Sequence, residues 1–301
     1  MLKKEEFYEL EEIYKILKEI DFNFIKPEQS FAIRAMRVGN HYFTSIDIAR
    51  VAGQAVIDAY KKNKGIRLKV NLDEPDIIIR TDVIQNEIYV GIDTTGDDAL
   101  HKRWYRIYNH PAPLNPTIAS CMIKIAKWNK NEILFDPMCG SGTILIEAAL
   151  KERNIPIGKN RQFAYYKIFG EEIPEIKENE DIMEIYGMDK FMKHINGAIL
   201  NARKAGVDDT IKFFQGDATK YCMDADIIIT NPPYGLRIGS KKIIKKLYDD
   251  FLKRAKNVKK MVVITTQSEI FKQYAINHGF KIDMELKIKY GNLDAKIFLI
   301  S

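Results

Sequence analysis

The sequence predicts an α/β protein: a Rossmann-like, mostly parallel sheet of seven strands whose last strand is antiparallel, preceded by a small α+β domain. Two observations predict the large sheet. From residue 132 onward, short apolar runs alternate with helical patterns, as in parallel sheets covered on both faces. The last two runs, 280–289 and 295–300, are separated by Gly-Asn-Leu-Asp, which is a hairpin spacing.

The small domain is expected over residues 1–95. Apolar residues at helical spacing predict a helix at 3–19, and alternation predicts a strand at 31–38. Ser45 is expected to cap a helix at 46–62, which a glycine then ends. Three further strands are expected at 66–71, 76–83 and 87–93.

Residues 96–128 are expected to link the two domains. Three prolines in HPAPLNP require an extended stretch, and a helix is expected from Thr117 to Trp128. The large domain is then expected over 129–301. Its apolar runs are ILFDP, IYGMD, IKFFQGD, DIIITNPPY and MVVITT, followed by the hairpin. Its helices are expected near 142–152, 191–205, 243–256 and 268–278.

Composition excludes several classes of protein. No apolar run approaches the roughly 18 residues of a membrane span, and the charged start MLKKEEFYEL is unlike a signal peptide, so we expect a cytoplasmic protein with no membrane partner. The three cysteines form no CxxC pair and the five histidines are scattered, which predicts neither a disulfide framework nor a metal site. The net charge of +6 is compatible with a nucleic acid partner.

The first motif with chemical meaning is DPMCGSGT, residues 136–143, which follows a strand and opens a helix. Gly140 and Gly142 let the backbone approach a ligand closely, and the helix N-terminus favours an anionic group such as a carboxylate. Leu145 stands where a dinucleotide fingerprint has its third glycine, which argues against NAD. The alternative is a tight turn without a ligand.

Two acidic residues end the next two apolar runs. Asp189 could accept both hydroxyls of a ribose, and Asp217 could accept from an adenine amino group. Because Asp189 lies far beyond the usual dinucleotide spacing from Asp136, residues 153–181 are expected to be an insertion. The alternative for each aspartate alone is a helix N-cap.

The most informative motif is Asn-Pro-Pro-Tyr at residues 231–234, directly after the run DIIIT. Two prolines end the strand rigidly, so that the Asn231 side-chain oxygen and the Pro232 carbonyl can both accept from an NH2 group. Two acceptors would polarise a conjugated amine and orient it toward a sulfonium methyl. Tyr234 offers a face for base stacking. We assign no general base, and the alternative is a rigid turn.

These motifs resemble those of class I methyltransferases that modify amino nitrogens. NPPY alone covers adenine-N6, glutamine-N5 and guanine-N2 enzymes, but NPPYGLRIGS with Arg237 is similar to the guanine-N2 group. RNIPIGKNRQFAYYKI (153–168) resembles the insertion of that group, and HPAPLNPTIASCMI (110–123) resembles its motif bordering the cofactor pocket. From residue 30 onward, the front domain resembles a THUMP domain, an RNA-binding module.

The resemblance is greatest to the archaeal tRNA (guanine-N2)-methyltransferase family, with its bacterial tRNA and rRNA relatives close behind. It implies S-adenosylmethionine as the methyl donor and tRNA as the substrate. The catalytic residues are expected to be Asn231, Pro232 and Tyr234. The cofactor-binding residues are expected to be Asp136, Cys139, Gly140, Gly142, Thr143, Asp189, Asp217, Ala218, Asn231, Asn115 and Thr117.

Methylation of guanine N2 in a paired stem requires the nucleotide to be flipped out, and basic side chains on phosphates could offset the cost. We expect HKRWYR and a lysine-rich helix to flank the pocket mouth, with Trp104 where the family has glycine. The RNA-binding residues are expected to be Arg103, Tyr105, Arg106, Arg237, Lys241, Lys242 and Lys245. The alternative is that the lysines form a solvated helix face.

Three other functions stay open. An adenine-N6 methyltransferase on RNA or DNA would use the same acceptors, a protein-glutamine methyltransferase would need no front domain, and a non-catalytic RNA-binding module would keep only the fold. The sequence leaves open the modified nucleotide, the number of methyl groups, and tRNA against rRNA. A monomer is the expectation for the oligomeric state.

Overall fold

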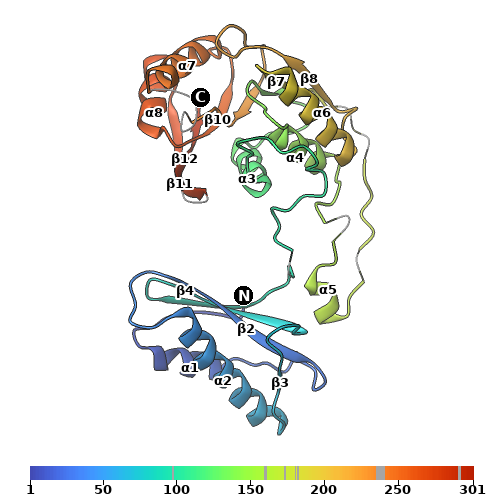
Figure 1. Ribbon diagram of the computed structural model, residues 1–301, viewed down its shortest axis with the longest axis vertical. Helices are drawn as coiled ribbons and strands as arrows, with labels where there is room; N and C mark the ends of the chain where they lie inside the picture. Colours follow the sequence, from blue (N-terminus) through green and yellow to red (C-terminus); the bar gives the residue numbers. More distant parts are fainter. Residues whose placement is uncertain are drawn as a thin grey trace. The chain divides into compact units, whose positions relative to one another are not determined.

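The computed structural model describes all of the 301 residues except 97, 159–160, 173, 180, 182, 235–240 and 291–292. The chain forms two compact units (Figure 1). Unit 1 consists of Met1–Ala99 and Arg161–Pro174, and unit 2 of Leu100–Asn160 and Glu175–Ser301. Residues 161–174 therefore belong to unit 1, although they interrupt unit 2 in the sequence.

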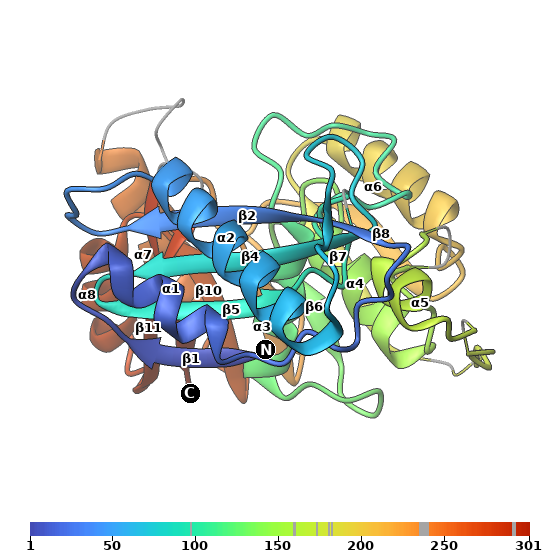
Figure 2. The ribbon, with the colours of Figure 1, turned by 90° about the horizontal axis from the view of Figure 1, so that it is seen from below.

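Unit 1 is a five-stranded sheet in the order β1-β5-β4-β2-β3, and two helices cross one face of it (Figure 2). The strands are β1 (Lys3–Glu6), β2 (Ser30–Val38), β3 (Lys69–Val70), β4 (Ile77–Ile84) and β5 (Glu87–Ile92). The helices are α1 (Leu10–Lys18) and α2 (Ser45–Lys64). The expected helix, strand, helix and three strands are all present, so the α+β character of this unit is confirmed.

Two local expectations for unit 1 were wrong. Residues 3–6 form a strand paired antiparallel with β5 instead of the start of a helix, because the amphipathic pattern begins only at Leu10. Thr44, not Ser45, caps α2: its hydroxyl accepts from the Asp47 amide at 3.3 Å, and the Asp47 carboxylate accepts from the Thr44 amide at 2.9 Å. Gly65 ends the helix in the left-handed conformation, as expected.

A short helix, α5 (Ala164–Phe169), comes from the insertion and packs in unit 1. Ile168 is buried in the same apolar core as α1 and α2. The Tyr165 amide donates to the Thr94 carbonyl at 3.0 Å, and Lys167 lies 3.5 Å from Asp76. The sequence predicted an insertion here but no helix.

Unit 2 is a seven-stranded sheet in the order β11-β12-β10-β9-β6-β7-β8. The strands are β6 (Leu134–Asp136), β7 (Ile185–Asp189), β8 (Ile211–Gln215), β9 (Ile227–Thr230), β10 (Lys260–Thr265), β11 (Ile282–Tyr290) and β12 (Leu293–Ile300). The neighbouring strands β10, β9, β6, β7 and β8 are parallel, and β12 is antiparallel to both β10 and β11. The predicted Rossmann-like architecture is confirmed.

Helices cover both faces of this sheet. They are α3 (Pro116–Ala126), α4 (Thr143–Glu152), α6 (Met192–Ala205), α7 (Lys241–Arg254) and α8 (Ser268–Asn277). The first three share one apolar core, and α7 and α8 share another. Along β9, Ile227 and Ile229 pack into the first core while Ile228 packs into the second. Burial on both faces explains why this strand is apolar at every position from Ile227 to Ile229.

The chain order of the strands reverses at β6, which has β7 on one side and β9 on the other. In open α/β sheets, ligands bind beyond the carboxyl ends of the strands at such a switch point. The segments after β6 and β9, which carry both glycines and Asn231, therefore lie at the expected place for a ligand. Across the part of the chain that is described, no helix is both long and apolar enough to cross a membrane.

Candidate functional site

A pocket lies at the carboxyl ends of β6 and β9. It is lined by His110, Ala112, Leu114, Asp136, Met138, Cys139, Gly140, Ser141, Thr143, Ile144 and Asn231. It thus brings together the glycine turn, the segment before α3 and the start of the Asn-Pro corner, which are far apart in the sequence. Within the described residues, no cluster of His, Cys, Asp and Glu side chains could hold a metal ion.

The glycine turn has the geometry that a close ligand requires. Gly140 and Gly142 have φ of 54° and 77°, in the left-handed region that favours glycine. Gly142 is also the N-cap residue of α4, and a Cβ there would come within 3.1 Å of both Ala198 and Phe213. Ser141 and Thr143 line the pocket at the helix N-terminus, where an anionic group is favoured.

Asp136 is buried at the end of β6. Its Oδ1 accepts from the Thr230 hydroxyl at 2.7 Å and from the Met138 amide at 3.1 Å, which ties β6 to β9. Burial raises the pKa of Asp136 to about 7, because the charged form loses its hydration. A cationic ligand in the pocket would favour the ionised carboxylate.

Asp189 and Asp217 each accept backbone hydrogen bonds near the ends of their strands. Asp189 accepts from the Gly140 amide at 3.0 Å and from the Phe191 amide at 2.9 Å. Asp217 accepts from the Thr219 amide at 3.0 Å and lies 3.0 Å from the Lys190 ammonium. Burial would raise the pKa of Asp217, but bonds from Thr219 and Lys190 outweigh it and lower the pKa to about 2.

Neither aspartate is among the residues that line the pocket, and neither is buried Ala218. The bond from Gly140 to Asp189 nevertheless ties the end of β7 to the glycine turn. Each carboxylate oxygen of Asp189 retains a second lone pair. Ribose hydroxyls could therefore bind there without breaking the two backbone bonds.

The Asn-Pro corner follows β9 directly. Asn231 lines the pocket, and its Oδ1 accepts from the Tyr234 hydroxyl at 2.5 Å. The oxygen predicted to accept from a base amine thus accepts from Tyr234 in this structure. Arg237 lies outside the described residues. Lys241, Lys242 and Lys245 are exposed in the first turns of α7, which fits both an RNA track and a solvated face.

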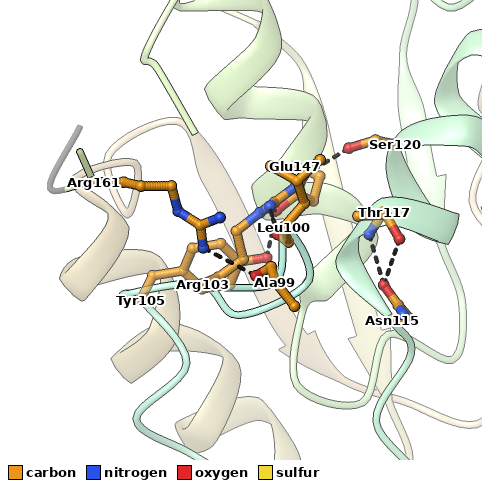
Figure 3. A network of polar contacts seen from close by, with 9 residues as sticks. All are labelled: Ala99, Leu100, Arg103, Tyr105, Asn115, Thr117, Ser120, Glu147 and Arg161. Carbon is orange, nitrogen blue, oxygen red and sulfur yellow. Dashed lines mark hydrogen bonds and ion pairs between the residues drawn. The ribbon is translucent and has the colours of Figure 1, made fainter. Parts of the chain in front are cut away.

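Asn115 is the N-cap residue of α3, and neither it nor Thr117 is among the residues that line the pocket. The Asn115 Oδ1 accepts from the Thr117 amide at 2.9 Å and from its hydroxyl at 2.7 Å (Figure 3). Pro116 occupies the first turn, where its missing amide costs nothing. The Asn115 Oδ1 and the Thr117 hydroxyl are thus bonded to each other, and Leu114 is the neighbour that lines the pocket.

Arg103 and Tyr105 were expected to contact RNA, but both side chains are buried in unit 2. They bind Glu147 of α4: the Arg103 Nε donates to Oε1 at 2.8 Å and the Tyr105 hydroxyl donates to the same oxygen at 2.7 Å (Figure 3). The expectation of direct RNA contact is wrong for these two side chains in this structure. Arg106 remains half-exposed.

The motif at 110–123 was predicted from the sequence, but the residues of it that line the pocket were not. His110 Nδ1 accepts from the Ala112 amide at 3.1 Å, and the opposite edge of the ring lies over Gly140. Burial, with a contribution from His194, lowers the pKa of His110. Glu147 was not predicted either, although a single acid in the apolar part of the helix TILIEAALKE indicates a buried partner.

The fold and this pocket together define a class I methyltransferase domain. The model of the RMKL-like methyltransferase domain family matches residues 103–296, and the model of the THUMP domain matches residues 7–93. The chain belongs to the family of RMKL-like methyltransferases, and it carries a THUMP domain. S-adenosylmethionine is the methyl donor of this domain. A THUMP domain joined to it implies an RNA substrate. The THUMP match begins before α1, earlier than the resemblance from residue 30 suggested.

Curated relatives are similar over nearly the whole chain. A tRNA (guanine(6)-N2)-methyltransferase of Methanocaldococcus jannaschii is 51% identical over 97% of this chain and 81% of its own. One of Archaeoglobus fulgidus is 53% identical over 96% of this chain and 74% of its own. A solved structure, a possible methylase from Clostridium difficile 630, is 31% identical with a TM-score of 0.76, covering 99% of this chain and 81% of that one.

The residues present fit S-adenosylmethionine. The left-handed glycine turn and the N-terminus of α4 offer backbone amides to a carboxylate. Asp136, buried with a raised pKa, would gain from a neighbouring positive charge. Asp189 and Asp217 stand at the ends of the next two parallel strands, where acceptors for ribose and adenine are needed.

Proposed function

We propose that this chain transfers a methyl group to the exocyclic N2 of a guanosine in tRNA. The observation that carries the proposal is the Asn231-Pro232 corner, which opens into the same pocket as the glycine turn. The two relatives named as tRNA (guanine(6)-N2)-methyltransferases support guanosine 6 as the target. The proposed cellular site is the cytoplasm, and the proposed state is a monomer.

In this proposal, the corner holds and activates the amine. The Asn231 Oδ1 and the Pro232 carbonyl accept the two N–H groups of the guanine amine, which draws electron density toward nitrogen and fixes its direction. The Tyr234 hydroxyl gives up its bond to Asn231, and the ring stacks on the flipped base. The amine loses its proton after transfer, so no residue acts as a strong base.

The cofactor site is proposed to extend from the pocket to the ends of β7 and β8. Bound S-adenosylmethionine supplies an electrophilic methyl group. The backbone at Cys139, Gly140, Gly142 and Thr143 holds its carboxylate end, Asp189 its ribose, and Asp217 with Ala218 its adenine. Asn115 and Thr117 act by capping α3, and so by fixing Leu114 in the pocket wall.

RNA is proposed to bind through both parts of the chain. Residues 1–95 form the THUMP domain, 96–128 the linker, and 129–301 the catalytic domain in this division. Exposed Lys241, Lys242 and Lys245, together with Arg106 and Arg237, are proposed to contact phosphates at the pocket mouth. Recognition then depends on RNA shape more than on sequence.

The test is to incubate the protein with a tRNA transcript and isotope-labelled S-adenosylmethionine, digest the RNA to nucleosides and identify the labelled product by mass spectrometry. The expected product is N2-methylguanosine. A matched transcript with adenosine at position 6 should take up no label. Labelled N6-methyladenosine, or label in protein, would show that the guanosine assignment is wrong.

A further inference from the structure

Glu147 is a buried carboxylate that the proposed reaction does not use. Only 3% of it is exposed, and apart from Thr143 the other buried residues of its helix are apolar. Its Oε1 accepts from Arg103 Nε at 2.8 Å and from the Tyr105 hydroxyl at 2.7 Å. Its Oε2 accepts from Arg103 Nη2 at 2.9 Å and from the Ser120 hydroxyl at 2.7 Å. One side chain thus joins the linker, α3 and α4 (Figure 3).

A second buried polar residue, Asn201 of α6, holds the next part of the linker. Its Oδ1 accepts from the Ile107 amide at 3.0 Å and from the Tyr108 amide at 2.8 Å. Its Nδ2 donates to the Ser141 carbonyl at 3.1 Å, within the glycine turn. Asn201 is 1% exposed, so these bonds have no competition from water. The linker backbone and the glycine turn are therefore fixed to one side chain.

Tyr108 and His110 extend this arrangement to the pocket. The Tyr108 ring lies directly on α6 at Gly197, where an added Cβ would come within 2.2 Å of it. The Tyr108 hydroxyl and His194 Nδ1 are 2.8 Å apart, and the rings of His194 and His110 meet edge to face at 4.2 Å. His110 then lines the pocket, together with Ala112 and Leu114.

An apolar side chain at position 147 would fill the same space without the cost of burying a charge. The carboxylate instead fixes the direction of three segments through four hydrogen bonds. We infer that Glu147 and Asn201 are positioning residues: they hold residues 103–108 so that His110, Ala112 and Leu114 form one wall of the cofactor pocket. This inference rests on the proposed assignment of the pocket to S-adenosylmethionine.

The experiment measures the binding of S-adenosylhomocysteine by calorimetry, which needs no RNA and no turnover. Tyr105→Phe removes one hydroxyl from Glu147 and leaves a ring of the same shape. Tyr248→Phe is the matched control, because its hydroxyl is equally buried and bonds Thr265 at 2.7 Å against the opposite core. Tyr105→Phe is expected to raise the Kd about tenfold, and Tyr248→Phe to leave it unchanged.

Glu147→Gln and Asn201→Ala are expected to raise the Kd further, and the KM for S-adenosylmethionine with it, while kcat at saturating cofactor and the KM for tRNA stay within about twofold. Folding is checked by thermal denaturation, and Tyr105→Phe keeps the test decisive if the stronger variants unfold. Two results would overturn this inference and leave the cofactor site standing. One is an equal Kd for wild type and folded Tyr105→Phe, and the other is the same rise in Kd for Tyr248→Phe as for Tyr105→Phe. Failure of the wild type to bind S-adenosylhomocysteine would instead overturn the cofactor site itself.

Discussion

The Asn231 side-chain oxygen accepts from the Tyr234 hydroxyl in this structure and is proposed to accept from a guanine amine during the reaction. Its oxygen lies at the pocket and accepts from Tyr234, so the corner already holds a donor where the account places the base amine. A carbonyl oxygen has two lone pairs, so a guanine amine could enter before the tyrosine leaves. The motif was predictable from sequence because two prolines fix the backbone, whereas the Tyr234 bond depends on a rotamer that no spacing reveals.

Asn231→Ala should lower kcat about 100-fold, since one positioned polar group in an active site contributes on this order. Steady-state methylation of tRNA measures it. Tyr234→Phe is the control, because it keeps the ring and loses only the hydroxyl bonded to Asn231. It should retain most of kcat. Methyl transfer by Asn231→Ala at the wild-type rate would show that this residue does not activate the amine.

Asp136 should make stability depend on pH. Its folded pKa of about 7 lies above the unfolded value of about 3.9. Between these values, the folded state binds a proton that the unfolded state lacks, so stability falls as pH rises from about 4 to 7. Asp136→Asn should therefore gain stability relative to wild type between pH 5 and pH 8, as measured by urea denaturation.

Asp217→Asn is the comparison for this pH dependence. The pKa of Asp217 is lowered to about 2, so its stabilising contribution is present above about 4 and is lost only in acid. The difference in unfolding free energy between this variant and wild type should stay constant between pH 5 and pH 8. A flat difference for Asp136→Asn over the same range would contradict the raised pKa.

At the scale of elements, the parallel strands and long helices were predictable from the sequence. A strand buried on both faces is a continuous apolar run, and a helix buried along one stripe has apolar residues at helical spacing. The apolar run at β9 and the apolar spacing in α2 are examples. β1 and α5 were missed because each is short and takes its stability from a partner distant in sequence: β5 for the first, the core around Ile168 for the second. The local apolar pattern of a segment does not reveal partners that are distant in the sequence.

Two helical glycines should respond oppositely to alanine. Gly197 of α6 touches the Tyr108 ring, so Gly197→Ala must displace that ring, at a cost of about 1–3 kcal/mol, and should weaken S-adenosylhomocysteine binding. A Cβ added at Gly53 of α2 would lie at an ordinary 3.7 Å from Ile33, so Gly53→Ala should stabilise the protein by about 0.5–1 kcal/mol. Thermal denaturation and calorimetry measure both effects. A stabilised Gly197→Ala variant with normal binding would contradict the described packing of Tyr108.

At the scale of the whole molecule, the chain alternates between its two units. Unit 1 is completed by residues 161–174, which follow α4 of unit 2. The sequence predicted an insertion from the long separation of Asp136 and Asp189. It could not assign the insertion to a unit, because six helical residues carry too little pattern to identify the core they join.

RNA should bind to particular basic side chains rather than to the net positive charge of the whole chain. Reversal of Lys241, Lys242 and Lys245 to Glu should weaken tRNA binding and reduce the slope of log K against log salt by about two units. Reversal of Lys253, Arg254 and Lys256, exposed at the other end of α7, changes the net charge equally and is the control. Filter binding over a salt series measures both. An equal loss in the two triple variants would mean that net charge, rather than the start of α7, attracts the RNA.

The most direct test of the account is a crystal structure with S-adenosylhomocysteine bound. The amino acid end of the ligand is predicted to lie against Gly140 and Gly142, with its ribose at Asp189 and its sulfur facing Asn231. A ligand bound away from the carboxyl ends of β6 and β9, or with its sulfur turned from Asn231, would contradict the account.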